Sequence, residues 1–488
     1  MSLIQITDLT FAYEGSYDNI FEQVNLKIDT NWRLGLTGRN GRGKTTLLRL
    51  LMGELEYRGH ISAKVEFVYF PYHVKDSWKT AGEIARTLCP ENEEWELLRE
   101  LSYLDVPEEV LERPFETLSG GQRTKVLLAA LFLGENRFLL IDEPTNHLDL
   151  EGRKALSRYL HKKQGYIVVS HDRAFLDGCV DHILSINKAD ITVQQGNFST
   201  WWENKQRQDS FEQQQNEKLK KEVKRLQETA REKSSWSDRT ETEKWGGDCN
   251  DCGYAGHKAE KMMKRAKAIE RRAKAAAEEK ASLLKNLDVA SDLKLCPQTH
   301  YAETLVRLQA VTARYGDNVG CNNVSFTVKQ GDRIALQGKN GCGKSTVLKL
   351  ICEKQIDFTG TVDKASGLKI SYVSQETSEL QGNLSDYACQ YGIDESQFKT
   401  ILRKMGFLRD QFEKNMADFS GGQKKKVLIA RSLCEKAHLY VWDEPLNYID
   451  VLSRMQIEDL LLTYQPTLLF VEHDAQFCHR IATKIVEV

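Results

Sequence analysis

Long apolar runs, net charge and a disulfide framework are all lacking in this sequence of 488 residues. No stretch reaches the roughly eighteen consecutive apolar residues of a membrane-spanning helix, and the start, MSLIQITDLTFAYEG, lacks the basic stretch and apolar run of a signal peptide. The formal charge is only −2, so overall charge gives no argument for nucleic acid, although a local basic stripe can hide in that average. The 11 cysteines are scattered and odd in number, which suits a reducing cytosol. We therefore expect a cytoplasmic protein.

The chain is long enough for two or three domains, and it repeats itself. Four motifs return in the same order at an almost constant spacing. The pairs are GRNGRGKT (38–45) with GKNGCGKS (338–345), LSGGQ (118–122) with FSGGQ (419–423), LLIDEPTNHLD (139–149) with YVWDEPLNYID (440–450), and VVSHD (168–172) with FVEHD (470–474). This order predicts two homologous domains, over residues 1–200 and 301–488.

Each copy alternates short apolar runs with helical patterns. RLGLTG (33–38) predicts a strand, GRGKTTLLRLLMG (41–53) a loop that turns into a helix, and RFLLIDEP (137–144) a buried strand. The expected class is α/β with a parallel sheet, in which ligands bind at the carboxyl ends of the strands.

The segment between the copies, residues 201–300, has a different composition, rich in Lys, Glu, Gln and Ala. Apolar residues recur at steps of three and four on two stretches, with a glycine-containing break near 234–256. This pattern predicts an antiparallel coiled-coil hairpin whose tip lies near 234–256. Two solvated single helices are the alternative, but they would leave both apolar stripes unburied.

The loop pattern GxxxxGK[ST], after a strand and before a helix, predicts a phosphate cradle made of backbone amides, a lysine and a magnesium-binding hydroxyl. One such match is compatible with an ordinary glycine-rich turn, whereas two matches, each followed by a strand ending in Asp-Glu, are not. The candidate nucleotide-binding residues are Gly38, Asn40, Gly41, Gly43, Lys44, Thr45 and Thr46, and Gly338, Asn340, Gly341, Gly343, Lys344, Ser345 and Thr346.

Each of those strands delivers an Asp-Glu pair to the phosphates. Asp142 and Asp443 are expected to hold Mg²⁺ with Thr45 and Ser345, and the following Glu143 and Glu444 are expected to orient or deprotonate the attacking water. The LSGGQ motif predicts a further helix N-terminus for a γ-phosphate, but it lacks a lysine and cannot form a nucleotide site alone. Its candidate residues are Ser119, Gly120, Gly121 and Gln122, and Ser420, Gly421, Gly422 and Gln423.

Taken together, these motifs resemble the nucleotide-binding domains of the ATP-binding-cassette superfamily, over nearly the whole of both copies. The resemblance implies that two cassettes meet head to tail around two ATP molecules with Mg²⁺, so that Lys44 shares a site with Ser420 and Lys344 with Ser119. It also implies a set of further roles. These are switch histidines at His171 and His473, D-loop aspartates at Asp149 and Asp450, adenine-stacking aromatics at Tyr13 and Tyr315, and a magnesium-sensing glutamine at Gln375.

Two cassettes separated by a helical hairpin look like the ABC-F proteins, which bind the 70S ribosome near the tRNA exit site and reach toward the peptidyl-transferase centre. Three departures are similar to the Lsa-like antibiotic-resistance group: Tyr72 stands where Gln375 stands in the second copy, DEPLNYID replaces DEPTNHLD, and the chain stops at Val488. The missing glutamine puts the equivalence of the two ATP sites in doubt. A monomer with paired cassettes is expected.

The segment GGDCNDCGYAGHKAEKM (246–262) raises the possibility of a zinc knuckle. Cys249, Cys252 and His257 fill three ligand places, but the fourth holds Met262, whose thioether is a poor zinc ligand. On a helix, His257 and Met262 also diverge around the axis. We therefore expect no zinc.

Local charge accounts for this region better. Residues 257–274 carry eight Lys and Arg against two Glu, and such a basic stem is expected to track RNA phosphates. Aromatic residues of the tip are expected to stack on bases or pack against rRNA; a solvated coiled coil whose aromatics close its own turn is the alternative. The candidate RNA contacts are Lys261, Lys264, Arg265, Lys267, Arg271, Trp236, Trp245 and Tyr254.

The leading function is thus a ribosome-binding ATPase that protects translation from drugs at the peptidyl-transferase centre; the Lsa-like resemblance implies lincosamides, pleuromutilins and streptogramin A compounds. The nearest alternative is a housekeeping ABC-F factor for stalled or initiating ribosomes. The ATPase of a membrane exporter is a third, and the helical hairpin argues against it. A DNA-repair ATPase of the superfamily would carry long insertions or complete zinc modules, which the sequence lacks.

Overall fold

The computed structural model describes residues 2–13, 19–146, 148–187, 191–212, 214–215, 217–218, 221, 293–295, 297–315, 318–339, 341–352, 356–378, 380–407 and 409–488. Contacts divide the chain into two compact units: Met1–Trp201 with Ala290–Val488, which contains both cassettes, and Trp202–Val289. Helical residues 202–212 open the second unit. The predicted hairpin and its tip lie almost entirely outside the described residues, and the exact domain boundaries stay a prediction.

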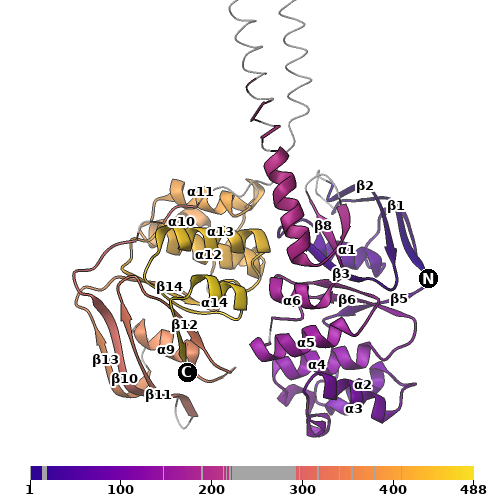
Figure 1. Cartoon of the computed structure of the whole chain (residues 1–488), viewed down its shortest axis with the longest axis horizontal. Coiled ribbons are helices and arrows are strands. Elements are labelled where there is room, and N and C mark those ends of the chain that lie inside the picture. Colours follow the sequence, from indigo (N-terminus) through magenta and orange to yellow (C-terminus); the bar gives the residue numbers. More distant parts are fainter. Residues whose placement is uncertain are drawn as a thin grey trace, which may run out of the picture. The chain divides into compact units, whose positions relative to one another are not determined.

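Each cassette is built on a central sheet (Figure 1). The first has the order β5-β6-β7-β3-β8-β9 and the second the order β14-β15-β16-β12-β17. All neighbours pair in parallel except β8 with β9. The strands are β3 (Arg33–Gly38), β5 (Glu66–Phe70), β6 (Arg137–Asp142), β7 (Tyr166–Val169), β8 (His182–Ile186) and β9 (Ile191–Gln195), then β12 (Arg333–Gln337), β14 (Ile370–Val373), β15 (Leu439–Asp443), β16 (Leu468–Val471) and β17 (Lys484–Glu487). The predicted parallel α/β class is confirmed.

A second, antiparallel sheet of three strands belongs to each cassette. Its strands are β1 (Leu3–Phe11), β2 (Phe21–Asp29) and β4 (Arg58–Ser62) in the first cassette, and β10 (Thr304–Tyr315), β11 (Asn318–Lys329) and β13 (Asp357–Lys364) in the second. The GxxxxGK[ST] loops, residues 38–45 and 338–345, are called the P loops below. The apolar residues of the antiparallel sheet, of the helix after the P loop and of the central sheet form one buried cluster in each cassette. The P-loop helix is therefore fixed between two sheets.

Burial explains why the central strands are apolar throughout. Every residue of β7, β15 and β16 is buried, as expected for parallel strands that are covered on both faces. The covering helices are α1 (Lys44–Leu51), α2 (Ala81–Leu88), α3 (Glu94–Tyr103), α4 (Gly120–Leu131), α5 (Leu150–His161) and α6 (Arg173–Cys179), then α9 (Lys344–Ile351), α10 (Leu384–Gln390), α11 (Glu395–Lys404), α12 (Gly421–Cys434), α13 (Val451–Tyr464) and α14 (Ala475–Ile481). Short 3₁₀ turns complete the connections, at η1 (Glu108–Glu112), η2 (Phe115–Thr117), η3 (Arg409–Phe412) and η4 (Met416–Asp418).

Within the described ranges, no helix is both long enough and apolar enough to cross a lipid bilayer.

The P loop of the second cassette turns through two glycines with left-handed backbone angles, Gly341 (φ 83°) and Gly343 (φ 100°). Among the described atoms, a Cβ on Gly341 would meet nothing within 4 Å. A Cβ on Gly343 would collide with the backbone oxygen of Gly320 and lie 2.7 Å from the Cβ of Cys321. Both positions favour glycine, but only Gly343 is also packed against backbone.

We expect Gly343→Ala to lower the free energy of unfolding by about 1–3 kcal/mol more than Gly341→Ala, because the backbone strain is common to both and the collision is not. Urea unfolding without nucleotide measures the difference. Equal losses in the two variants would contradict the close approach of Gly343 to β11.

Candidate active site

The P-loop lysines are buried and fold back onto their own loops. The Nζ of Lys44 donates to the carbonyl of Gly38 (2.8 Å) and to the side-chain oxygen of Asn40 (3.2 Å). The Nζ of Lys344 likewise donates to the carbonyl of Gly338 (2.8 Å). Burial lowers the pKa of Lys44, although nearby carboxylates oppose that shift. Each ammonium group is thus fixed over the loop, where a phosphate would meet it.

A hydroxyl and a carboxylate meet beside each P loop, as a magnesium site requires. The Oγ1 of Thr45 donates to Asp142 (2.9 Å), and the Oγ of Ser345 donates to Asp443 (3.1 Å). The second carboxylate oxygen of Asp443 is buried without a hydrogen-bond partner among the described residues. Burial raises the pKa of Asp443 to about 6. An orphaned acceptor beside a hydroxyl fits the hard oxygen ligands that Mg²⁺ prefers.

Two residues that the sequence did not single out contact the aspartates of these sites, Asp142 and Asp443. The hydroxyl of Tyr69, on β5, donates to Asp142 (3.1 Å), and burial raises the pKa of Tyr69. In the second cassette the Nζ of Lys425, on α12, donates to the carbonyls of Asp443 (3.1 Å) and Gln375 (3.3 Å). Burial lowers the pKa of Lys425 to about 8. The only sequence signals are the first tyrosine of VYFPYHV and the KKK run after FSGGQ.

The predicted catalytic glutamates and switch histidines come together in both cassettes. The backbone N–H of Glu143 donates to the end of β7 (2.9 Å), and that of Glu444 to the end of β16 (3.0 Å). The Nε2 of His171 lies 3.2 Å from Oε1 of Glu143, and the Nε2 of His473 lies 3.4 Å from Oε1 of Glu444. Each pair stands at the carboxyl ends of the central strands, beside the magnesium position.

The two glutamates differ in their hydrogen bonds. Glu444 accepts from the amides of Gln375 (3.0 Å) and Asn447 (2.6 Å). In contrast, the Oε1 of Glu143 is buried without a hydrogen bond from a described residue, and Tyr72, at the position of Gln375, is 41% exposed. The predicted magnesium role of Gln375 stays a prediction, because its amide donates to the glutamate here.

Burial raises the pKa of Glu143 to about 8, with a further contribution from the adjacent Asp142 carboxylate. Burial also acts to raise the pKa of Glu444, but the hydrogen bond from His473 and the charges of His473 and Lys425 outweigh it and hold that pKa below its usual value. The ionised form that a general base needs is therefore better supported at Glu444.

The LSGGQ and FSGGQ motifs begin helices α4 and α12. Ser119 caps α4 by accepting from the N–H of Gln122 (3.2 Å), whose side chain accepts from Ser119 in return (3.1 Å). Ser420 and Gln423 form the same reciprocal capping box on α12. The two glutamines are therefore used in the caps, and the glycines behind the serines present the helix N-terminus.

Two cavities each combine a P loop of one cassette with the capped helix of the other. Site A, of about 620 Å³, is lined by Asn40, Gly41, Gly43, Lys44, Thr45, Thr46, Asp142, Glu143 and His171, and by Ser420, Gly421, Gly422 and Tyr448. Site B, of about 890 Å³, is lined by Gly341, Gly343, Lys344, Ser345, Thr346, Gln375, Glu444 and His473, and by Ser119, Gly120, Gly121, Gln122, Leu148 and Asp149. The Nδ2 of Asn40 also donates to the carbonyl of Tyr448 (2.7 Å). The structure thus brings together the residues expected to share each ATP.

Tyr13 lines site A, and its ring is partly exposed. The hydroxyls of Tyr13 and Thr46 share a hydrogen bond (3.0 Å). The D-loop aspartates are helix caps: Asp149 caps α5 and Asp450 caps α13. Burial acts to raise the pKa of Asp450, but a hydrogen bond from Lys426 (2.6 Å) and its charge hold that pKa well below its usual range. Asp450 therefore remains ionised.

Other predicted residues cannot be placed. Tyr315 ends β10, but the prediction for its ring lies outside the described residues, as does Asn340. The zinc-knuckle residues and the RNA-contact residues also lie outside them, namely Cys249, Cys252, His257, Met262, Lys261, Lys264, Arg265, Lys267, Arg271, Trp236, Trp245 and Tyr254.

This geometry defines a tandem P-loop ATPase with two composite sites. A family model described as ABC transporter matches residues 21–146 and 321–447. The chain belongs to that family and is an ATP hydrolase of the ABC type.

Curated relatives match nearly the whole chain. YdiF of Bacillus subtilis, a "Putative ATP-binding protein", is 28% identical and covers 100% of this chain and 80% of its own. VmlR of the same organism, a "Ribosome protection protein", is 28% identical and covers 97% of this chain and 85% of its own. These relatives support the ABC-F branch. Among solved structures, the archaeal ribosome recycling factor aABCE1 has a TM-score of 0.64 at 19% identity, over 98% of this chain and 87% of its own, which shows the fold alone.

We expect Glu444→Gln to lower ATP turnover by about 100-fold or more, and by a larger factor than Glu143→Gln, because Glu444 is held by two amides in its ionised form. Steady-state phosphate release from the two single variants, at equal protein concentration and neutral pH, measures the order. The opposite order, or equal losses, would contradict the difference between the two sites.

Proposed function

We propose that this chain is an ABC-F ATPase that binds the ribosome and protects the peptidyl-transferase centre from antibiotics. The observation that carries the proposal is that both nucleotide cavities are completed within one chain, while a separate unit, Trp202–Val289, is inserted between the cassettes. Such a chain needs no second ATPase subunit. The inserted unit is then available for a partner of its own.

Charge supports an RNA partner for that unit. Residues 257–274 carry eight Lys and Arg against two Glu, in a chain whose overall charge is near zero. Cationic side chains bind nucleic acid mainly by neutralising phosphates. The relation to VmlR, which is named for ribosome protection and aligns over nearly the full chain, favours the ribosome as the source of that RNA. We therefore propose that the protein acts on the ribosome as a monomer in the cytoplasm.

In the proposed cycle, the protein's own residues bind ATP and handle one proton. Lys44 and Lys344 meet the phosphates from one cassette, and the N-termini of α12 and α4 meet them from the other. Mg²⁺, held by Thr45 with Asp142 and by Ser345 with Asp443, would neutralise phosphate charge when bound. A carboxylate oxygen of Glu444, oriented by the amides of Gln375 and Asn447, accepts the proton of the attacking water. Hydrolysis then releases the contact between the cassettes.

The drug-protecting role rests on the resemblance of the motifs to the Lsa-like group, with lincosamides, pleuromutilins and streptogramin A compounds as the expected drugs. One observation favours a second candidate, a housekeeping factor for stalled or initiating ribosomes. YdiF matches at the same identity as VmlR, and its name states ATP binding only. Identity alone therefore does not separate the two roles.

We expect Glu143→Gln combined with Glu444→Gln to bind ATP but not to hydrolyse it, because the amide keeps the size of the side chain and loses the base. Its association with 70S ribosomes should become long-lived in ATP, which sucrose-gradient sedimentation with ATP and with ADP measures. ATP turnover at the parental rate would contradict the assigned base, and ATP-independent sedimentation would contradict the cycle.

We expect expression in a susceptible bacterium to raise tolerance to the three drug classes, and shortening of residues 240–252 to remove most of it while ATP turnover persists, since both ATP cavities lie in the cassettes. Minimum inhibitory concentrations measure this. Reversing the charges of Lys264, Arg265 and Lys267 should weaken ribosome binding and reduce its salt dependence. Reversing the exposed Lys27, Arg58 and Lys64 of the first cassette, also two lysines and one arginine, serves as the matched control.

Full tolerance after the deletion would overturn the drug-protecting mechanism. No tolerance from the well-expressed parent, together with ribosome binding and altered polysome profiles, would instead favour the housekeeping factor.

A further inference from the structure

A buried arginine lies one helical turn after the D-loop aspartate of each cassette. It joins the D loop, the segment that ends at Asp149 or Asp450, to the switch loop, the segment that carries His171 or His473. In the first cassette Arg153, on α5, is 7% exposed. Its Nε donates to the carbonyl of Leu148 (3.1 Å), and its Nη1 donates to Asp172 (2.9 Å). Leu148 belongs to the D loop, and Asp172 directly follows the switch histidine His171.

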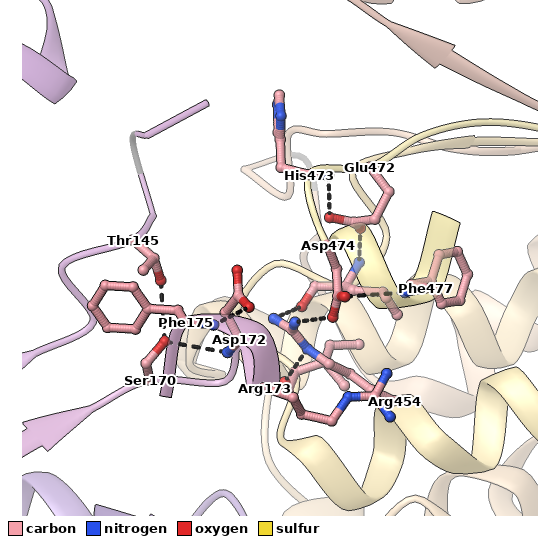
Figure 2. A network of polar contacts seen from close by, with 12 residues as sticks. Thr145, Ser170, Asp172, Arg173, Phe175, Arg454, Glu472, His473, Asp474 and Phe477 are labelled. Carbon is pink, nitrogen blue, oxygen red and sulfur yellow. Dashed lines mark hydrogen bonds and ion pairs between the residues drawn. The ribbon is translucent and has the colours of Figure 1, made fainter. Parts of the chain in front are cut away.

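Arg454, on α13, makes the corresponding contacts in the second cassette. Its Nε donates to the carbonyl of Ile449 (2.9 Å), its Nη2 to that of Leu446 (2.8 Å), and its Nη1 to Asp474 (3.2 Å). Asp474 follows the switch histidine His473. Figure 2 shows the contact of Arg454 with Asp474.

The two loops that each arginine contacts line different ATP cavities. Leu148 lines site B, whereas His171 lines site A. In the second cassette, Tyr448, which lies between the two carbonyls held by Arg454, lines site A, whereas His473 lines site B. Each arginine therefore connects the D loop of one site to the switch histidine of the other, and the two connections run in opposite directions.

These connections are rigid for physical reasons. The guanidinium is planar and permanently charged, and its fork holds a carbonyl and a carboxylate at a fixed separation. The aspartates are fixed at their other oxygen, because Asp172 caps α6 by accepting from the N–H of Phe175 (3.0 Å) and Asp474 caps α14 by accepting from that of Phe477 (3.0 Å). A shift of either loop leaves a buried charge unpaired unless the other loop follows.

A further hydrogen bond joins the D loop to the switch loop in each cassette. It lies at the same position in both cassettes but is made by different chemical groups. In the first cassette the hydroxyls of Thr145 and Ser170 share a hydrogen bond (3.2 Å). In the second cassette leucine replaces that threonine, and the carboxylate of Glu472 accepts from the N–H of Leu446 (3.1 Å) and from that of His473 (2.8 Å). Figure 2 shows the bonds of Thr145 with Ser170 and of His473 with Glu472. The loops are thus held together in both cassettes by different side chains.

One ion pair joins the two connections across the cassettes. Arg173, which follows Asp172, pairs with Glu458 on α13, the helix that carries Arg454, and both side chains are buried. Arg480 also pairs with Glu458 (2.5 Å). The same ion pair cannot form in the opposite direction, because Ala475 stands at the position of Arg173 and Ser157 at the position of Glu458.

We propose that Arg153 and Arg454 are positioning residues that couple the two ATP sites, so that a change at the switch histidine of one site moves the D loop that lines the other. They touch neither nucleotide nor water in this proposal and act through Leu148, Tyr448 and the two switch loops. The proposal rests on the assigned ATP sites and not on the ribosome or the drug role.

The test compares turnover at the two sites within one background. In the parent, and in Arg153→Leu combined with Arg454→Leu, the bases are removed singly as Glu143→Gln and Glu444→Gln. The kcat values of the two single-base variants are summed and divided by the kcat of their own background. Independent sites give a ratio of one, whereas coupling of about fivefold or more gives a ratio of about one fifth or less. The ratio does not change with the active fraction of the protein, so a merely structural loss leaves it unmoved.

We expect a low ratio in the parent and a ratio that rises toward one in the double leucine background. Arg431→Leu is the matched control, because Arg431 is also buried, pairs with Glu435 and lines neither site; its ratio should stay at the parental value. If the leucine background lacks cooperative thermal unfolding, Arg153→Lys with Arg454→Lys carries the test, because an ammonium keeps the charge but lacks the fork, and the ratio should again rise.

A parental ratio of one would overturn the proposal. So would a low ratio that persists in the folded leucine or lysine background, because coupling would then run only through the opening and closing of the cassettes.

Discussion

Each nucleotide cavity lies between the P loop of one cassette and a capped helix N-terminus of the other, and this arrangement organises the molecule. Each P loop supplies a lysine, backbone amides and one helix N-terminus, while the remaining helix N-terminus, capped by Ser119 or Ser420, belongs to the other cassette. Neither element is a complete site alone. Because parallel strands end at one edge of each sheet, the sheet holds the P loop, the Asp-Glu pair and the switch histidine together, and the opposite cassette completes the set.

The same frame carries two unequal sites. Around Glu444, Gln375 and Asn447 supply amide donors, and Lys425 holds the neighbouring backbone. Around Glu143 the glutamine position is Tyr72, and Tyr69 contributes a hydroxyl to Asp142 instead. Because both cassettes have the same backbone arrangement, the difference lies in a few side chains. Amides donate to the carboxylate of Glu444, whereas the Oε1 of Glu143 is buried without a hydrogen bond from a described residue. A tandem ATPase of this design can bind two ATP molecules while hydrolysing them at different rates.

The sequence predicts the cassettes and the partners in each cavity well, because glycine-rich loops, helix caps and buried strands leave local patterns. It does not predict Tyr69, Lys425, Arg153 or Arg454. Their roles depend on which strand or loop lies opposite, and an arginine one turn into α5 or α13 looks like any other helical arginine. The sequence shows that Tyr72 stands at the position of Gln375. Only the structure shows that the Gln375 amide donates to Glu444, which is the contact that Tyr72 does not provide for Glu143. The RNA contacts stay predictions, since those residues lie outside the described ranges.

The central claim is that each ATP joins a P loop to the helix of the opposite cassette and that this closed form acts on the ribosome. An electron cryo-microscopy structure of Glu143→Gln, Glu444→Gln bound to 70S ribosomes in ATP and Mg²⁺ tests it most directly. The account predicts two nucleotides, one between Lys44 and Ser420 and one between Lys344 and Ser119, with residues 257–274 against ribosomal RNA. Nucleotides that contact only one cassette, or a bound chain whose residues 257–274 face away from RNA, would contradict it.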